Sequence, residues 1–423
     1  MKVLLISHNP FSTYQSMGKT FLSLFSAFPK EELCQLYVYP SFPDVDAVAS
    51  CYRITDRDAI KRICPLAHAG GEVFPHAYTG SMIENGTDKK LYGKATNNQP
   101  LKRLLRDMVW KVSSWYTKDL QQWLDRENPD CIFLAPGYAK FIYDIALTVS
   151  RKRNIPVIVY ICDDNYFLAA PETLLGRIQL RLLQKKTRQI MDGSKLVVAI
   201  SKEIGDQYSR EFSIESEVIM TGAGFEVAQE SPDRAEINTF SYFGNLDLSR
   251  EKSLADIGRV LDEINDQQGT GYVLNIYTSN ETPAEFSDIK SIKMGGFLVG
   301  EAFSKAFRSA DCLVHVESFD EEMKDLVKGS VSTKIADSLA SGIPLLAYGP
   351  AGIASMEHLR RNDCAFVADS VESLKTVIGQ LLSDREMRNR ISENARNTAA
   401  CYHTSSANSV RLRAIVKQIA EGL

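Results

Sequence analysis

The chain has 423 residues, of which 44% are hydrophobic and 24% are charged, so we expect a globular protein with more than one hydrophobic core. Its formal net charge of -4 gives no basic signal and does not indicate nucleic acid as a partner. No apolar run reaches the ~18 residues that a membrane span needs, and the scattered cysteines form no metal-binding pattern. We therefore expect a cytoplasmic protein without a metal site, with any membrane contact at its surface.

Short apolar runs alternate with longer amphipathic stretches in the first half of the chain. The apolar runs predict strands at 2–7, 35–40, 131–137, 156–163 and 195–201. The amphipathic stretches 102–127 and 142–153 predict helices between them. This alternation is typical of a doubly wound parallel sheet.

The same alternation starts again after 226–239, a polar segment with a proline and no hydrophobic period, which we interpret as an interdomain linker. Further strands are predicted at 240–246, 272–278, 292–298, 312–318, 343–349 and 364–369. Helices are predicted at 253–265, 299–309, 333–340 and 371–382. The sequence therefore predicts an α/β protein whose two Rossmann-like doubly wound domains, 1–225 and 240–384, face each other across a cleft. A helical segment, 385–423, is expected to pack toward the first domain.

Two hydroxyls and a lysine stand directly before an apolar helix in the segment STKIADSLASG, 332–342. Ser332 or Thr333 can cap the helix, and the N–H groups of a helix start can also bind an anion. The pattern alone leaves two interpretations open. One is an N-cap followed by a solvated Lys334, and the other is a phosphate-binding turn.

The order of four segments in the second half resembles the nucleotide-binding domain of GT-B-fold glycosyltransferases, in particular the retaining family 4 type. These segments are YFGNL (242–246), ADCLVHVES (310–318), STKIADSLASGIPLLAYGP (332–350) and LLSDREMRNRISENARNTA (381–399). In the first half, PVIVYICDD (156–164) and VVAISKEIGDQYSREF (197–212) resemble strands and turns of the same family. The stretch 9–40 resembles the opening of its members that build bacterial surface polysaccharides.

The resemblance implies a site for a nucleoside diphosphate sugar, whose diphosphate gains negative charge as it leaves. Ser332, Thr333 and Lys334 would bind the diphosphate, and Asp337 would accept hydrogen bonds from the ribose hydroxyls.

Three further residues are implied to contact the donor. Gly18 and Gly244 would let backbone turns approach its phosphates. Arg250 would hold the diphosphate, unless it is an ordinary surface charge. The resemblance implies no cofactor and no metal ion, and the nucleoside diphosphate sugar is a substrate.

The acidic residues depart from the family pattern. Retaining members usually carry two glutamates eight positions apart, but here Asp337 fills the second position and Gly329 stands in the first. Glu317, at a predicted strand end, is our candidate for the missing catalytic acid, with a solvated acidic loop as the alternative. Asp163 and Asp164 end another strand and either act on the acceptor hydroxyl or cap a helix.

The resemblance implies a metal-independent, retaining hexosyltransferase in the assembly of a bacterial polysaccharide or another glycan. Two alternatives stay open. A nucleotide-sugar 2-epimerase uses the same fold and donor site without an acceptor, and a non-catalytic module would bind nucleotide sugar or glycan without turnover.

The segment 173–191 predicts a helix with five cations and no acid. Arg177, Arg181, Lys185 and Arg188 fall along one side of it, with leucines and an isoleucine beside them. Such a helix suits peripheral contact with an anionic membrane that holds a lipid-linked acceptor. The alternative is a surface helix whose leucines face the core.

Overall fold

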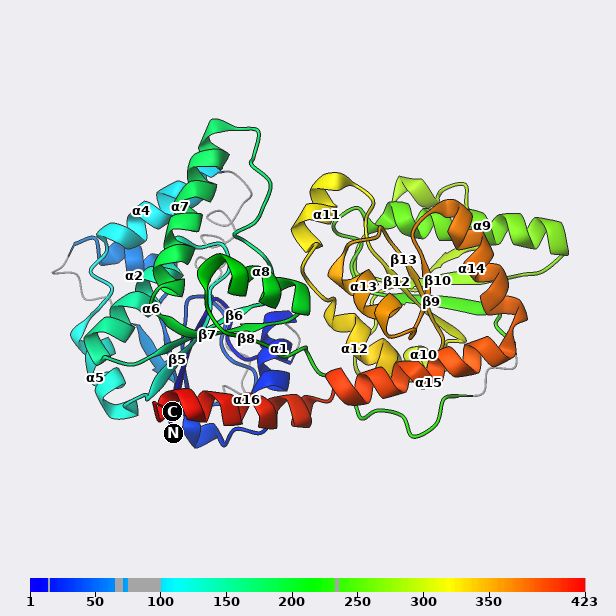
Figure 1. Cartoon of the computed structure of the whole chain (residues 1–423). Coiled ribbons are helices and arrows are strands. Elements are labelled where there is room, and N and C mark those ends of the chain that lie inside the picture. Colours follow the sequence, from blue (N-terminus) through cyan, green and yellow to red (C-terminus); the bar gives the residue numbers. More distant parts are fainter. Residues whose placement is uncertain (14–15, 65–70, 75–99, 233–235, 423) are drawn as a thin grey trace. The chain divides into compact units, whose positions relative to one another are not determined.

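The computed structural model describes residues 1–13, 16–64, 71–74, 100–232 and 236–422 (Figure 1). It divides into two compact units, which are described separately below. Unit 1 comprises Met1–Ile219 and Ser405–Leu423, and unit 2 comprises Met220–Thr404. The chain therefore passes between the units twice.

Unit 1 contains an eight-stranded sheet in the order β4-β3-β2-β1-β5-β6-β7-β8. All its strand pairs are parallel except β3 with β4, which is antiparallel. The strand order reverses between β1 and β5, which makes that position the topological switch point of the sheet. The strands are β1 (Val3–Ser7), β2 (Leu33–Tyr37), β3 (Ser50–Arg53), β4 (Glu72–Phe74), β5 (Cys131–Ala135), β6 (Val157–Ile161), β7 (Ser194–Ala199) and β8 (Ser216–Val218).

Helices cover both faces of this sheet, and each face has its own apolar core. The helices are α1 (Ser16–Leu24), α2 (Asp56–Lys61), α4 (Pro100–Val112), α5 (Lys118–Glu127), α6 (Lys140–Arg153), α7 (Leu174–Met191), α8 (Lys202–Phe212) and α16 (Ser405–Ala420). The single helix predicted at 102–127 is two helices, because Thr117 caps a new start by accepting a hydrogen bond from the N–H of Leu120 at 3.2 Å.

Unit 2 contains a six-stranded, wholly parallel sheet in the order β11-β10-β9-β12-β13-β14. Its switch point lies between β9 and β12. The strands are β9 (Thr239–Phe243), β10 (Val273–Tyr277), β11 (Ile292–Met294), β12 (Cys312–Val316), β13 (Leu345–Tyr348) and β14 (Phe366–Ala368). The helices are α9 (Arg250–Gln268), α10 (Gly300–Ser309), α11 (Glu321–Val327), α12 (Thr333–Ala340), α13 (Ala354–Arg361), α14 (Val371–Ser383) and α15 (Arg385–Tyr402).

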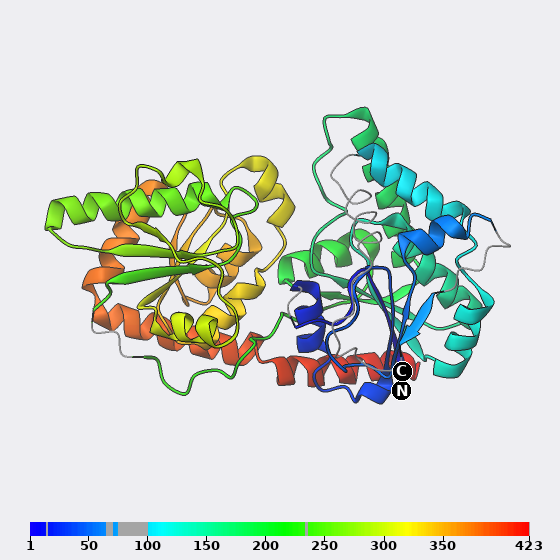
Figure 2. The ribbon, with the colours of Figure 1, turned by 180° about the vertical axis from the view of Figure 1, so that it is seen from behind.

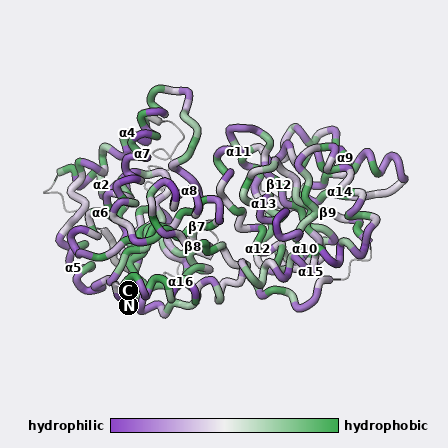
Figure 3. Tube along the Cα trace, in the orientation of Figure 1, coloured by the Kyte–Doolittle hydropathy of each residue, from purple (hydrophilic) through white to green (hydrophobic). Residues whose placement is uncertain are grey.

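The view from behind (Figure 2) shows helices on both sides of each sheet, and Figure 3 shows hydrophobic residues concentrated along the strands. The prediction of two doubly wound α/β domains is confirmed. Among the described residues, no helix combines the length and the apolar character that a bilayer crossing requires.

The division of the chain differs from the predicted domain limits. The first passage between units falls at Ile219–Met220, before the predicted linker 226–239. The described start of that linker is bound to unit 2, because the N–H of Ala228 donates to the carbonyl of Ala340 at 2.8 Å. Of the predicted C-terminal segment, 385–423, α15 stays in unit 2 and only α16 belongs to unit 1.

Helix α16 completes one face of unit 1. Leu412 and Val416 are fully buried in the core beside α1. The N–H of Ala27 donates to Oγ of Ser409 at 2.8 Å, and Arg413 makes two hydrogen bonds to the carboxylate of Glu32. The short C-terminal helix is therefore an integral part of the first unit.

Two histidines of unit 2 connect its first and last residues, next to which the chain passes to unit 1. Nε2 of His358 lies 3.0 Å from Nε2 of His403, and Nδ1 of His403 lies 2.9 Å from the carbonyl of Thr221. Burial lowers the pKa of both imidazoles, that of His358 to about 3 with help from His403 and Arg361. Both rings are therefore neutral, and the contact to Thr221 requires the Nδ1 of His403 to donate its proton.

Candidate functional site

The carboxyl ends of β9 and β12 flank the switch point of unit 2, where open α/β sheets bind ligands. Gly244 follows β9 directly, and Glu317 follows β12. Helix α12 begins nearby in the fold, since Lys334 in its first turn reaches the side chain of Tyr242 on β9. Residues from three separate chain segments thus meet at this sheet edge.

Lys334 lies against Tyr242 and Gly244. Its Nζ donates to Oη of Tyr242 at 3.3 Å and lies 5.0 Å from the centre of the tyrosine ring. Burial, followed by the positive charge of Arg250, lowers the pKa of Lys334 to about 8. The surroundings therefore oppose the ammonium charge, and an anion bound there would relieve this cost.

Gly244 makes the close approach of Lys334 possible. A Cβ at this position would clash with Nζ of Lys334. The N–H of Gly244 donates to the carbonyl of Tyr277 at 3.1 Å, which fixes the turn after β9. The glycine predicted from sequence is required here by space, and the group that occupies that space is a cation.

Arg250 is buried in the same cluster. Its Nη2 donates to Oε2 of Glu317 at 3.3 Å, and its Nη1 donates to Oδ1 of Asn245 at 3.1 Å. Its Nε is buried without a hydrogen-bond partner in the described part of the chain. Arg250 is thus not an ordinary surface charge.

Glu317 does not present a free carboxyl group. Its side chain is buried, and its carboxylate lies between Arg250 and Nε2 of His315, which is 3.2 Å from Oε1. Burial raises the pKa of Glu317, but His315, Arg250 and Lys334 together lower it below its usual range. We therefore interpret Glu317 as an ionised residue that positions Arg250, and its catalytic role stays a prediction.

His315 is a member of the cluster that the sequence analysis missed. It lies on β12 two residues before Glu317, so both side chains point to the same face of the strand. Burial lowers the pKa of His315, which keeps the ring neutral. The spacing H-x-E at the end of a buried strand was the available signal.

The first turn of α12 lacks the predicted side-chain cap. Ser332 occupies the N-cap position, but its hydroxyl makes no capping hydrogen bond, and its N–H donates to Oγ of Ser355 at 3.0 Å. Thr333 is exposed. The N–H groups at the start of α12 are therefore not capped by Ser332, and Lys334 lies beside them. Of the two interpretations of this motif, this arrangement favours the phosphate-binding turn over the N-cap.

Asp337 lies one turn further along α12 and is partly buried. Its Oδ1 accepts a hydrogen bond from the N–H of Gly224 at 2.7 Å. This contact fixes the carboxylate against the backbone of unit 2. A contact between Asp337 and a ribose stays a prediction.

The remaining predicted residues belong to unit 1. Asp164 has a structural role, since its Oδ1 accepts hydrogen bonds from the N–H groups of Tyr166 and Phe167 and from the hydroxyl of Tyr208. Asp163 is exposed at the end of β6, as predicted.

Gly18 also has an explanation within unit 1. A Cβ at Gly18 would lie 2.6 Å from the backbone nitrogen of Ser12, so this glycine lets α1 pack closely on the preceding segment. A contact between the turn at Gly18 and donor phosphates stays a prediction.

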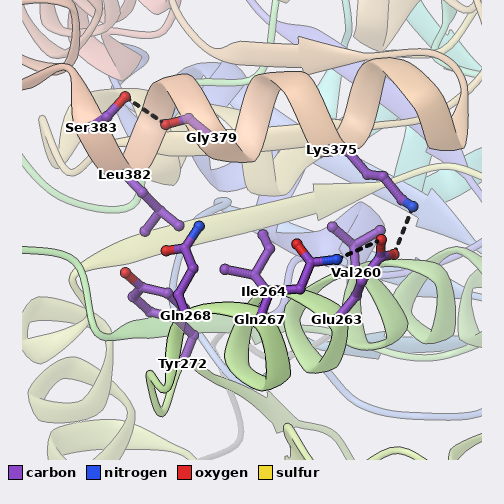
Figure 4. Close-up of a pocket in the computed structure, with 10 residues that line it drawn as sticks. All are labelled: Val260, Glu263, Ile264, Gln267, Gln268, Tyr272, Lys375, Gly379, Leu382 and Ser383. Carbon is purple, nitrogen blue, oxygen red and sulfur yellow. Dashed lines mark hydrogen bonds and ion pairs between the residues drawn. The ribbon is translucent and has the colours of Figure 1, made fainter.

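Two pockets lie away from this cluster. One, of about 440 Å³ in unit 2, lies between α9 and α14 and is closed at one end by the ion pair of Lys375 with Glu263 (Figure 4). It contains none of the predicted site residues. The other, of about 290 Å³, lies at the switch point of unit 1 and includes His8, Arg103 and Arg106.

Burial, together with the charge of Arg106, lowers the pKa of His8 to about 3, so this pocket contains a neutral imidazole. Its Nδ1 is buried without a hydrogen-bond partner among the described residues. Within the same residues, no group of His, Cys, Asp and Glu could hold a metal ion.

Comparison with known proteins gives the following similarities. Residues 257–414 match a family model described as glycosyl transferase-like, and no curated protein sequence matches the chain. Among solved structures, the sucrose-phosphate synthase of Thermosynechococcus elongatus is 12% identical, with a TM-score of 0.62 over 100% of both chains. HepE of Anabaena, solved with UDP and glucose, is 12% identical, with a TM-score of 0.63 over 99% of this chain and 100% of the other.

The trehalose 6-phosphate synthase of Burkholderia multivorans is 9% identical, with a TM-score of 0.57 over 100% of this chain and 98% of the other. At these identities, the similarity shows the fold alone. The chain has the GT-B fold, with two doubly wound units.

Proposed function

We propose that the protein is a glycosyltransferase that moves a sugar from a nucleoside diphosphate sugar to an acceptor hydroxyl. The observation that carries this proposal is the cationic cluster at the switch point of unit 2. There Lys334, with a pKa lowered to about 8, occupies the space left by the absent side chain of Gly244. The glycosyl transferase-like match over 257–414 includes His315, Glu317 and Lys334 of this cluster.

The cluster suits the charge that develops in such a reaction. When the bond between the sugar and the diphosphate breaks, negative charge grows on the leaving phosphate oxygens. Lys334 and the N–H groups at the start of α12 would stabilise this charge. Arg250, held in place by Glu317 and Asn245, would contribute a second cation.

The proposal assigns the neutralisation of the diphosphate to these protein groups, without a metal ion. A chelator should then leave the transfer rate unchanged, and dependence on added divalent metal would contradict this part. We further propose that the anomeric configuration of the sugar is retained, which proton NMR of the first product formed would test.

The donor screen should begin with uridine diphosphate sugars. HepE of Anabaena was solved with UDP-glucose. A ligand present at about 100 times its Kd should raise the stability by about 2.7 kcal/mol, which thermal unfolding would detect. We propose a bacterial glycan as the acceptor and a cytoplasmic location for the reaction, at the inner face of the cell membrane.

The decisive experiment measures nucleoside diphosphate binding and donor consumption in the same preparation. Lys334→Ala should weaken binding by about 10- to 150-fold, as expected for loss of a hydrogen bond to a charged group. Lys290→Ala is the matched control, because Lys290 is an exposed lysine that precedes β11, at the opposite edge of the same sheet. Equal affinity of the Lys334→Ala variant and the wild type would refute the assignment.

Product analysis separates the alternatives. A transferase consumes the donor and glycosylates an acceptor, whereas a 2-epimerase yields a new nucleotide sugar without any acceptor. A non-catalytic module would bind the donor and leave it unchanged.

A further inference from the structure

Two neighbouring helices of unit 1 expose an unusual number of large apolar side chains. Eight of the nineteen exposed large hydrophobic residues in the described part of the chain lie on α4 and α7. We call them the α4–α7 surface: Leu101, Leu105, Met108 and Val112 on α4, and Leu174, Leu175, Ile178 and Leu182 on α7. Leu174 is 73% exposed and the four residues of α4 are each more than half exposed. These side chains are therefore not the partly covered margin of the hydrophobic core.

The apolar residues form one stripe on each helix. Those on α4 are spaced by four, three and four positions, and Leu174, Ile178 and Leu182 on α7 are spaced by four. The two helices pack against each other, and they lie side by side in Figure 1. The stripes therefore lie on two adjacent helices of unit 1.

The core contacts of α7 come from other residues. Leu183, Thr187, Ile190 and Met191 are buried, and three of them lie in the last two turns of the helix. The exposed leucines of the first turns are consequently not used to hold α7 on unit 1. In an ordinary surface helix these leucines would face the core, whereas here they are exposed.

Cations border the apolar stripes. Arg177, Arg181 and Lys185 are exposed on α7, and Lys111 is exposed on α4. No acidic partner for these four side chains occurs among the described residues. In contrast, Arg188, which the sequence placed in the same row, is engaged by Glu211 and lies over the ring of Tyr166.

We propose that the α4–α7 surface binds an anionic membrane at its interfacial layer. Leucines and methionine would enter the boundary between head groups and acyl chains, while the bordering cations would contact lipid phosphates. An apolar face bordered by exposed cations matches a bilayer that supplies both anionic head groups and apolar chains. The inference goes beyond the proposed transfer reaction and does not depend on it.

Helix α4 also contributes Arg103 and Arg106 to the pocket at the switch point of unit 1. Docking through α4 would bring that pocket close to the lipid head groups. A molecule anchored in the membrane by a lipid tail could then reach the pocket with its polar part.

The test uses the full chain and sedimentation with vesicles. The wild type should bind vesicles that contain phosphatidylglycerol at about 50 mM salt, bind pure phosphatidylcholine vesicles far less, and dissociate at about 500 mM salt. The variant Arg177→Gln/Arg181→Gln/Lys185→Gln should bind about two orders of magnitude more weakly, since each cation near an anionic surface contributes roughly a factor of five. The variant Lys290→Gln/Lys293→Gln/Lys305→Gln, with the same charge change on unit 2, should bind like the wild type.

A second variant tests the apolar part. Leu174→Ser/Ile178→Ser/Leu182→Ser keeps every cation and should still lose binding at low salt, because charge alone cannot hold the protein. Each substituted side chain is exposed, so the fold should persist, and the fluorescence of the three tryptophans, all in unit 1, checks this.

Three results would overturn the proposal. The first is no binding of the wild type to anionic vesicles at low salt, and the second is equal binding to both vesicle types. The third is a dimer in sedimentation velocity that the apolar variant abolishes, which would show that a second copy covers the α4–α7 surface.

Discussion

The affinity for a nucleoside diphosphate should fall as the pH rises above about 8. In the empty site, burial and Arg250 lower the pKa of Lys334 from 10.5 to about 8. A bound diphosphate places negative charge beside the ammonium group and raises this pKa again. Below pH 8 Lys334 is already charged, so the affinity is at its maximum there. Above pH 8, binding must first add a proton to the neutral amine, so the affinity is progressively lost.

The size of the effect follows from these two values. If the pKa of Lys334 in the complex returns to at least 10.5, the Kd increases about tenfold between about pH 7 and about pH 9, or about 1.4 kcal/mol. Binding at about pH 9 should take up nearly one proton, and binding at about pH 7 nearly none. The terminal phosphate does not contribute to the difference at high pH, because its second pKa lies near 6.

Isothermal titration calorimetry in buffers of different ionisation enthalpy measures both the Kd and the number of protons. The variant Lys334→Arg keeps the charge and removes the titration, so its Kd should be independent of pH over this range. Lys334→Met should bind weakly at every pH. A wild-type Kd that stays constant from pH 7 to 9, with no proton uptake, would refute the link between Lys334 and the diphosphate.

Three further variants test other parts of the structure. Gly244→Ala should shift the ammonium group of Lys334, which an added Cβ would crowd, and weaken nucleoside diphosphate binding, although less than Lys334→Ala does, because the end of a lysine side chain can move. Hydrogen exchange should show that unit 2 stays folded in this variant. The pKa of His358 is lowered to about 3, so at pH 5 its imidazole is protonated in the unfolded state but not in the folded state. The free energy of unfolding of the wild type should therefore fall by about 2 kcal/mol through His358 as the pH falls from about 7.5 to about 5. The variant His358→Gln should lack this fall in stability, measured by hydrogen exchange of α13 and α15. Parallel pH profiles of the variant and the wild type would contradict the lowered pKa of His358. Leu412→Ala should destabilise unit 1 by about 2 to 5 kcal/mol in urea unfolding followed by tryptophan fluorescence, and a change below about 1 kcal/mol would show that α16 contributes little.

The elements with a clear hydrophobic period could be predicted from sequence. The helix predicted at 333–340 coincides with α12, and the strand predicted at 2–7 contains β1. Strands β3 and β4 were missed, since Ser50–Arg53 and Glu72–Phe74 are short and lack an apolar run. The pairing that makes them strands comes from β2 for β3 and from β3 for β4, and a local pattern does not contain it.

Most members of the site could be predicted, although His315 was missed, but their contacts could not. Gly244, Arg250 and Lys334 were all predicted, and the structure brings them to one sheet edge. The sequence could not show that Glu317 turns its carboxylate to Arg250, because this contact joins residues 67 positions apart. Asp164 illustrates the same limit, since its use in a turn depends on Tyr208, a residue of another helix.

The arrangement of unit 1 has a consequence for synthesis of the protein. Ser405–Leu423 leaves the ribosome only after the whole of unit 2, although its Leu412 and Val416 complete a core built from the first residues of the chain. At about 5 to 20 residues per second, translation of the roughly 185 residues of unit 2 takes about 10 to 40 s. During that interval the apolar face next to α1 lacks its cover, while unit 2, which is continuous, has everything it needs to fold. The nascent first unit is therefore the part of this chain that a ribosome-associated chaperone would have to protect.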